Sequence, residues 1–264
     1  GQWGMPAADP SWLMYQDKPW IRNAKMYAAM VNLVDREVGE VRKLLVELGL
    51  DKNTIVVLSG DNGAAKYFPD DQHQDGIFSP NVDPKTGVKF RGFKGQLYEG
   101  GLRVPYMAYW PGHIEGGRIS NHLCYFADVM PTLCDLTGAT CPKDSDRLSF
   151  APEPLGENAT RKQPDHDFLY WEHQQQIAVR QGNWKAIQPT KNGDWELYDL
   201  AADVSETKNL AAQNPNKLDE LKKIATAAHA PQQIGDIYDR SLVEKDRDYF
   251  AGKKTAKPKQ KNTK

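Results

Sequence analysis

The sequence is poor in cysteine and has no long hydrophobic run. Only three cysteines, Cys124, Cys134 and Cys141, occur among 264 residues, and they form no Cys-x-x-Cys pair. This count excludes a zinc finger or a disulfide-rich mini-domain, so we expect buried free thiols. The longest aliphatic stretch covers residues 55–58 and the mean hydropathy is -0.69. A bilayer span needs ~20 apolar residues, so we expect no membrane partner.

The chain also lacks an excess of either charge. It has 34 Lys and Arg residues against 35 Asp and Glu residues, a formal net charge of -1. A protein that binds nucleic acid usually carries a basic excess, so we expect no nucleic-acid partner. The positive charge gathers at the end of the chain, since residues 253–264 contain six lysines and no acid. We therefore predict an extended, disordered, Lys-rich tail over residues 233–264.

What is present is enough apolar sequence for a core, since hydrophobic residues make up 39% of the chain and aromatic residues 10%. Apolar residues recur at three- and four-residue spacing from Tyr27 to Leu48, which predicts a long amphipathic helix over residues 23–48. Asn23 is its expected N-cap, and Gly49 follows its expected end.

Two short apolar segments follow the helix, at residues 54–58 and 104–110. Their β-branched and aromatic composition is typical of strands buried on both faces of a parallel sheet. A further helix is predicted over residues 129–137, with Asp128 as its cap and Gly138 as its stop. Residues 1–140 therefore indicate an α/β domain.

The pattern changes after a Pro-rich and charged linker at residues 141–166. Short strands separated by turn residues predict a small antiparallel β-sheet subdomain over residues 167–232. A helix that begins at Pro215 has its apolar residues on one face, so we expect it to cover that sheet. The expected strands are 168–172, 177–180, 184–188 and 195–200.

Asp61 and Asn62 directly follow the first predicted strand, at the end where α/β sheets place their ligand sites. One anionic and one neutral oxygen donor suit a hard cation, Ca²⁺ or Mg²⁺. Asp-Asn-Gly is also ordinary turn chemistry, and these residues alone favour the turn interpretation over a metal site.

Residues 90–105 hold four glycines and three cations just before the second predicted strand. Glycines let backbone N–H groups approach a ligand, and Lys94 among them offers three donors to an oxyanion. We therefore expect an anion near Lys94. Glu99 and Arg103 are expected to pair with each other or with the backbone, because an unpaired charge beside a buried strand would be costly.

These segments, in this order, resemble the C-terminal half of the sulfatase family. The resemblance covers about residues 24–230 and rests on six strings taken together: TIVVLSGDNG, FRGFKGQLYEGGLRVPYMAYWPG, FADVMPTLCDLTG, FLYWEH, AVRQGNWK and WELYDL. It implies a partial alkaline-phosphatase-like α/β domain followed by a small antiparallel subdomain with a covering helix, the same two units that the pattern indicates.

The resemblance implies roles for particular residues. Asp61 and Asn62 match the second pair of calcium ligands in the family, with Mg²⁺ the less favoured ion. Lys94 matches the catalytic lysine that contacts the sulfate group. His173, in the FLYWEH string, could reach the mouth of the cleft and bind substrate, although a structural role is the stronger expectation for it.

The family's nucleophile is a formylglycine made within a Cys/Ser-x-Pro-x-Arg motif, and this sequence contains no such motif. The other pair of metal-binding aspartates and the upstream histidine are also missing, since no histidine precedes His73. We therefore expect part of a calcium-dependent sulfatase that acts on carbohydrate or aryl sulfates, with the nucleophile in an N-terminal half of the same protein. Family resemblance suggests a periplasmic or secreted location.

Two alternatives remain open at this point. One is a phosphoester or phosphonate hydrolase of the same superfamily, which would differ mainly in the nucleophile. The other is a non-catalytic module that binds an anion or a partner. The module would need a self-sufficient core, and two doubly buried strands argue against one.

Overall fold

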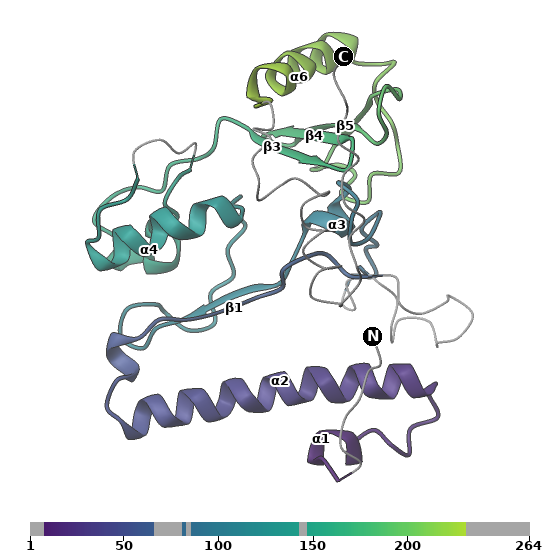
Figure 1. The fold of residues 1–264 in the computed structure, drawn as a ribbon. Coiled ribbons are helices and arrows are strands. Elements are labelled where there is room, and N and C mark those ends of the chain that lie inside the picture. Colours follow the sequence, from purple (N-terminus) through teal and green to yellow (C-terminus); the bar gives the residue numbers. More distant parts are fainter. Residues whose placement is uncertain (1–7, 66–80, 83–85, 143–146, 231–264) are drawn as a thin grey trace, which may run out of the picture. The chain divides into compact units, whose positions relative to one another are not determined.

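The structure is a computed structural model that describes residues 8–65, 81–82, 86–142 and 147–230 (Figure 1). The predicted tail at 233–264, His73 and most of the loop around it lie outside these residues. Among the described helices, none combines the length and the apolar composition required to cross a bilayer.

The N-terminal part is built around one long helix, α2 (Arg22–Glu47), with the short helix α1 (Pro10–Leu13) before it. Helix α2 begins one residue before Asn23, so Asn23 lies in its first turn and the expected cap is wrong. The side chain of Asp9 caps α1 by accepting from the Ser11 amide, and it pairs with Arg36 of α2 at 3.3 Å. That contact ties the two helices together.

Strands β1 (Val56–Ser59) and β2 (Tyr106–Tyr109) form a two-stranded sheet, with the 3-10 helix η1 (Asp51–Asn53) just before β1. The strands pair antiparallel, with Val56 opposite Tyr109. The expectation of parallel, doubly buried strands was therefore wrong for this pair: Val57 is 40% exposed and Met107 is 55% exposed. A run of apolar residues predicts a strand, but the direction of its neighbour is set by the chain between them.

Helix α4 (Val129–Thr137) has the predicted bounds and ends at Gly138, whose φ of 71° is left-handed. Asp128 does not cap α4 with its side chain. It instead accepts from the Tyr125 amide across the 3-10 helix η2 (Phe126–Asp128), and its carboxylate lies 2.8 Å from His166. Asp128 thus holds the segment around residue 166 against the start of α4.

The segment expected to be a linker contains the helix α5 (Pro152–Leu155) and the 3-10 helix η3 (Gly156–Asn158), and it buries Phe150. The three cysteines are free as expected, but each is partly exposed rather than buried.

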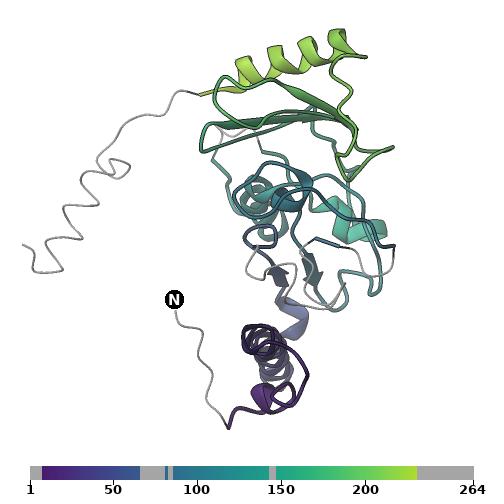
Figure 2. The same ribbon diagram turned by 90° about the vertical axis from the view of Figure 1, so that its right-hand side faces the viewer.

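The C-terminal sheet has the strand order β3-β4-β5-β6, antiparallel throughout (Figure 1). Its strands agree with the predicted ones to within one or two residues. Helix α6 (Pro215–Ala228) covers one face, as predicted (Figure 2). Its Leu218, Leu221 and Ala225 pack on that face's apolar residues. The strand bounds are Leu169–His173, Gln176–Gln181, Trp184–Gln188 and Glu196–Asp199.

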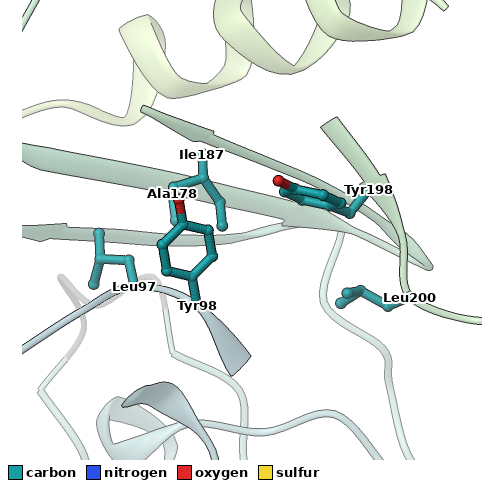
Figure 3. Packing of buried hydrophobic residues seen from close by; sticks show 6 residues of the cluster. All are labelled: Leu97, Tyr98, Ala178, Ile187, Tyr198 and Leu200. Atoms are coloured by element: carbon teal, nitrogen blue, oxygen red, sulfur yellow. The ribbon is translucent and has the colours of Figure 1, made fainter. Parts of the chain in front are cut away.

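The other face of this sheet packs on the segment just before helix α3 (Glu99–Leu102). Figure 3 shows Leu97 and Tyr98 of that segment lying against Ala178, Ile187 and Tyr198 of the sheet. The glycine-rich region around Lys94 is therefore fastened to the C-terminal sheet by a shared hydrophobic core.

Candidate functional site

Asp61 and Asn62 lie in the turn that follows β1, and both are exposed. The Asn62 side-chain amide donates a 2.7 Å hydrogen bond to the Asp61 carbonyl oxygen. Because the amide nitrogen is used in that bond, the side-chain oxygen of Asn62 is the atom that can act as a ligand. The pair thus offers a carboxylate and an amide oxygen from adjacent residues.

Lys94 is exposed, and its backbone lies beside the segment that carries this pair. Its amide donates a 2.9 Å hydrogen bond to the carbonyl oxygen of Ala64, two residues after Asn62. A second bond, of 3.1 Å, joins the Gly63 amide to the Gly101 carbonyl oxygen. The structure therefore brings together two segments that are thirty residues apart and that carry the predicted metal ligands and the predicted sulfate contact.

Two glycines are required here by close backbone packing. A Cβ on Gly63 would lie 2.1 Å from the Gly100 carbonyl oxygen, and a Cβ on Gly101 would lie 1.9 Å from the Gln96 carbonyl oxygen. Such distances are far inside contact range, so these positions admit no side chain. Gly63 lets the Asp61 turn pack against the backbone of the glycine-rich segment, and Gly101 lets that segment fold closely on itself.

His173 ends strand β3 at an exposed hairpin turn, opposite Gln176 of β4. The side chain of Gln176 fastens this turn to the segment around Lys94: its amide donates to the Gly95 carbonyl oxygen at 2.8 Å, and its oxygen accepts from the Leu97 amide at 3.3 Å. The structure therefore places the His173 turn against the residue that follows Lys94.

With these segments in place, the chain can be compared with known proteins. The sulfatase family profile matches residues 5–139, and the profile for the C-terminal region of N-sulphoglucosamine sulphohydrolase matches residues 91–229. The chain belongs to the sulfatase family. The two matches overlap across the glycine-rich segment, the part of the sulfatase chain that contacts both the Asp61 turn and the C-terminal sheet.

Similar sulfatases occur in fungi and animals. The chain is 33% identical over 232 residues to an uncharacterised sulfatase of Schizosaccharomyces pombe, covering 76% of this chain and 42% of that protein. It is 29% identical over 234 residues to N-acetylgalactosamine-6-sulfatase of Canis lupus familiaris, covering 87% and 42%. The chain thus spans about two fifths of the length of these curated relatives.

Solved structures share the fold. A structure bound to k-i-k-neocarrahexaose superposes with a TM-score of 0.64 at 23% identity, covering 95% of this chain and 54% of that one. A structure bound to its substrate D-glucosamine-2-N,6-O-disulfate has a TM-score of 0.56 at 22% identity, covering 86% and 41%. The alkaline-phosphatase-like fold class predicted from the sequence is confirmed.

A buried ion cluster joins the glycine-rich segment to the C-terminal subdomain. Glu99 pairs with Arg103 at 2.6 Å, as the sequence predicts. It also accepts from the ammonium of Lys185 at 2.8 Å, and Lys185 is fully buried in β5. Glu206, equally buried, forms an ion pair with the same ammonium at 2.9 Å. Its other carboxylate oxygen accepts a hydrogen bond from the Glu99 amide at 2.7 Å.

The pKa values of the two carboxylates in this cluster are shifted in opposite directions. Burial by itself would raise the pKa of Glu99, but the Lys185 ammonium and the Arg103 guanidinium outweigh it and hold that pKa below its usual value. Burial raises the pKa of Glu206 against the smaller influence of Lys185.

Lys185 and Glu206 were not identified from the sequence. A signal for Lys185 was present, because strand alternation places it on the same face as Ile187, and that face packs on Leu97 and Tyr98. A lysine on a buried face must have a buried anionic partner. No local pattern marks Glu206, whose role depends on a contact with Glu99 more than a hundred residues away.

The donor types at the Asp61 turn fit part of a calcium shell. Calcium takes ~6–8 oxygen ligands, and the turn offers the carboxylate of Asp61 and the side-chain oxygen of Asn62. Within the residues that the structure describes, no group of three or more His, Cys, Asp or Glu side chains could hold a metal ion. Further ligands would have to come from elsewhere.

Proposed function

We propose that this chain supplies the calcium ligands and the sulfate-binding lysine of an enzyme that hydrolyses sulfate monoesters. Asp61 and Asn62 hold the ion, Lys94 contacts the sulfate group, and a formylglycine is the nucleophile. The sequence has no Cys/Ser-x-Pro-x-Arg motif, so the nucleophile belongs to residues outside it, in an N-terminal half of the same protein. That half is the partner that completes the site.

One observation carries this proposal: the 2.9 Å hydrogen bond from the Lys94 amide to the Ala64 carbonyl oxygen. It joins the segment with the oxygen donors to the segment with the lysine, in a chain that belongs to the sulfatase family. The side chains of Asp61, Asn62 and Lys94 lie at exposed positions, where a ligand can reach them.

The chemistry assigned to each residue follows from its charge. The Lys94 ammonium is a compact donor that stabilises negative charge on the sulfate oxygens as the ester bond breaks. A bound Ca²⁺ would supply additional positive charge to the same group. Asp61 and Asn62 orient the site by fixing the ion, and His173 binds the substrate from the neighbouring hairpin.

The substrate class we propose is carbohydrate sulfates. Relatives of this chain are named N-acetylgalactosamine-6-sulfatase, and a structure of the same fold holds a sulfated glucosamine as its substrate. Exposed polar residues of the hairpin turn, His173 to Gln175, are chemically suited to hydroxyl groups of a sugar. Family resemblance also favours a periplasmic or secreted enzyme.

Exposed apolar surface supports an enzyme completed by further residues over a self-sufficient binding module. Helix α2 buries only three of its side chains, and all three lie in its first two turns. A group of exposed large apolar side chains on one helix is usually covered by another part of a protein. The exposed large apolar residues of α2 are Tyr27, Met30, Val31, Val34, Val41, Leu44 and Val46.

Calcium binding by the full 264-residue chain tests the metal assignment. We expect weak, saturable Ca²⁺ binding in isothermal titration calorimetry, lost in Asp61→Asn and retained in the matched control Asp219→Asn, which alters an exposed aspartate of α6. Equal binding by both variants would contradict the assignment of Asp61.

Turnover tests the proposed reaction. We expect no hydrolysis of an aryl sulfate by this chain alone, and hydrolysis when a polypeptide carrying the Cys/Ser-x-Pro-x-Arg motif completes it. Lys94→Ala should abolish that activity. Turnover by the chain alone would refute the proposed division of labour, and hydrolysis of an aryl phosphate in preference to the sulfate would favour the phosphoester alternative.

A further inference from the structure

We propose that Lys185 and Glu206, both contributed by the C-terminal subdomain, are positioning residues that hold the Lys94 segment against the Asp61 turn. The inference deepens the proposed function, since it concerns the same site. It gives the C-terminal sheet a specific role, because the buried charges of the subdomain set the place of Lys94 without contacting the ligand.

Glu206 contacts the backbone at the start of α3. The Glu206 carboxylate accepts a 2.7 Å hydrogen bond from the Glu99 amide. This amide is at the start of α3, where the backbone N–H groups have no partner within the helix. Glu206 itself has a left-handed φ of 53° and is fully buried. A non-glycine residue held in that conformation inside the protein marks a closely constrained turn.

Lys185 contacts two carboxylates, those of Glu99 and Glu206. Its ammonium lies 2.8 Å from Glu99 Oε1 and 2.9 Å from Glu206 Oε1, with no exposed surface. A fully buried ammonium is costly unless it is paired on more than one side. Because the two carboxylates share one cation, Lys185 fixes the distance between the turn at Glu206 and the start of α3.

The residues that flank Glu99 connect α3 to the site. Directly before Glu99, Leu97 and Tyr98 pack on the sheet. Two residues after Glu99, the Gly101 carbonyl oxygen accepts a hydrogen bond from the Gly63 amide. Lys94, five residues before Glu99, donates its amide to Ala64. A shift of Glu99 therefore moves both hydrogen bonds that hold the two segments together.

The test is amide hydrogen exchange on the full chain, read at Lys94 and Gly63 and compared with amides of the β4–β5 ladder. In Lys185→Met we expect exchange at Lys94 and Gly63 to be faster by about tenfold or more, together with a lower melting temperature. The matched control is Lys217→Met, which removes a partly exposed lysine that joins α6 to Gln181 of the sheet. The control should leave the Lys94 and Gly63 amides unchanged.

A double variant separates positioning from simple loss of stability. Lys185→Met leaves the buried Glu206 carboxylate without its contacting cation, and Lys185→Met with Glu206→Met removes that carboxylate too, which should recover most of the melting temperature. The double variant also removes the Glu206 acceptor of the Glu99 amide, so fast exchange at Lys94 and Gly63 should persist. Recovery of both properties, or normal protection in Lys185→Met, would overturn the proposal.

A ligand measurement connects the proposal to the site while keeping its failure distinguishable. If Asp61 binds Ca²⁺ as proposed, the double variant should bind it at least several-fold more weakly than the wild type. Should the wild-type chain bind no Ca²⁺ while the exchange results hold, the proposed function fails and the positioning role stands.

Discussion

Gly63 and Gly100 lie in van der Waals contact through their backbones, so closely that a Cβ on Gly63 would lie 2.1 Å from the Gly100 carbonyl oxygen. The atoms in the way are backbone atoms of a segment that is itself hydrogen-bonded to Arg91 through the Gly100 amide. Neither side can give way cheaply. The contact makes the approach of the two site segments a sensitive point of the structure.

Gly63→Ala should therefore separate the Asp61 turn from the Lys94 segment. Forcing a methyl group into a packed site typically costs about 1–3 kcal/mol, and we expect a loss of at least that size in the free energy of unfolding, measured by urea denaturation. The control is Gly39→Ala in α2, where a Cβ meets nothing within 4 Å. That exchange should stabilise the chain by about 0.5–1 kcal/mol; equal effects at both positions would contradict the packing argument.

The hairpin turn beside the site is conformationally strained. Gln174 has a φ of 46° and Gln175 a φ of 70°, where a two-residue hairpin turn favours Asn-Gly. Replacing the pair by Gln174→Asn and Gln175→Gly should raise the free energy of unfolding by about 1 kcal/mol. If the long side chains bind substrate, the same change should weaken binding of a sulfated sugar.

Gln213→Gly provides the comparison for this turn, because Gln213 is exposed and has no left-handed φ. There the added backbone freedom of glycine should destabilise the chain. Stabilisation at Gln213 would show that the gain at the hairpin does not come from relieved strain.

Two tyrosines at the interface between the sheet and the glycine-rich segment should make the protein sensitive to alkali. Burial raises the pKa of Tyr98 and of Tyr198, and hydrogen bonds from both hydroxyls to Glu196 raise them further. A raised pKa in the folded state adds stability that is fully present below the usual value of 10.0 and is lost as the pH rises above it. The free energy of unfolding should therefore fall above pH 10.

Glu196→Gln should move these two ionisations to lower pH, because it removes the negative charge that opposes the phenolates. Absorbance near 295 nm follows tyrosinate formation directly. The titration of Tyr170, whose pKa burial and Glu172 raise to about 12, should stay in place as an internal control. Unchanged titration of all three would contradict the assigned influence of Glu196.

The packing of α6 on the C-terminal sheet should account for much of that subdomain's stability. Leu221 is fully buried in the cluster that joins α6 to β4, β5 and β6. Leu221→Ala should cost about 2–5 kcal/mol in the free energy of unfolding, measured by thermal or urea denaturation. Leu133→Ala on α4, where the side chain is 42% exposed, should cost much less, and similar losses would contradict the role assigned to α6.

Local periodicity predicted the regular elements well. Helix α4 has the expected bounds, and α6 begins at Pro215 and covers the sheet as its apolar face requires. The four C-terminal strands follow from alternation and turn residues over a few positions each. These features depend on interactions between residues near in sequence, which a pattern can express.

The site, too, could be predicted only in part from the sequence. Asp61, Asn62, Lys94 and His173 could be proposed from residue type and family resemblance, and their roles stay predictions. The pairing of Glu99 with Arg103 was predicted because burying either charge alone is costly. The direction of β2 relative to β1 was predicted wrongly: a parallel sheet was expected and the strands are antiparallel, because no local pattern indicates which way a neighbouring strand runs.

The sequence by itself determined the bounds of helix α4 and, to within one residue, those of the four C-terminal strands, and it determined which side chains bear charge. Only the tertiary structure decided that Gly63, Gly100 and Gly101 exist for backbone packing, and that Lys185 and Glu206 close a buried ion cluster around Glu99. The reason is physical: close approach and buried charge depend on atoms that are distant along the chain and become neighbours only when it folds.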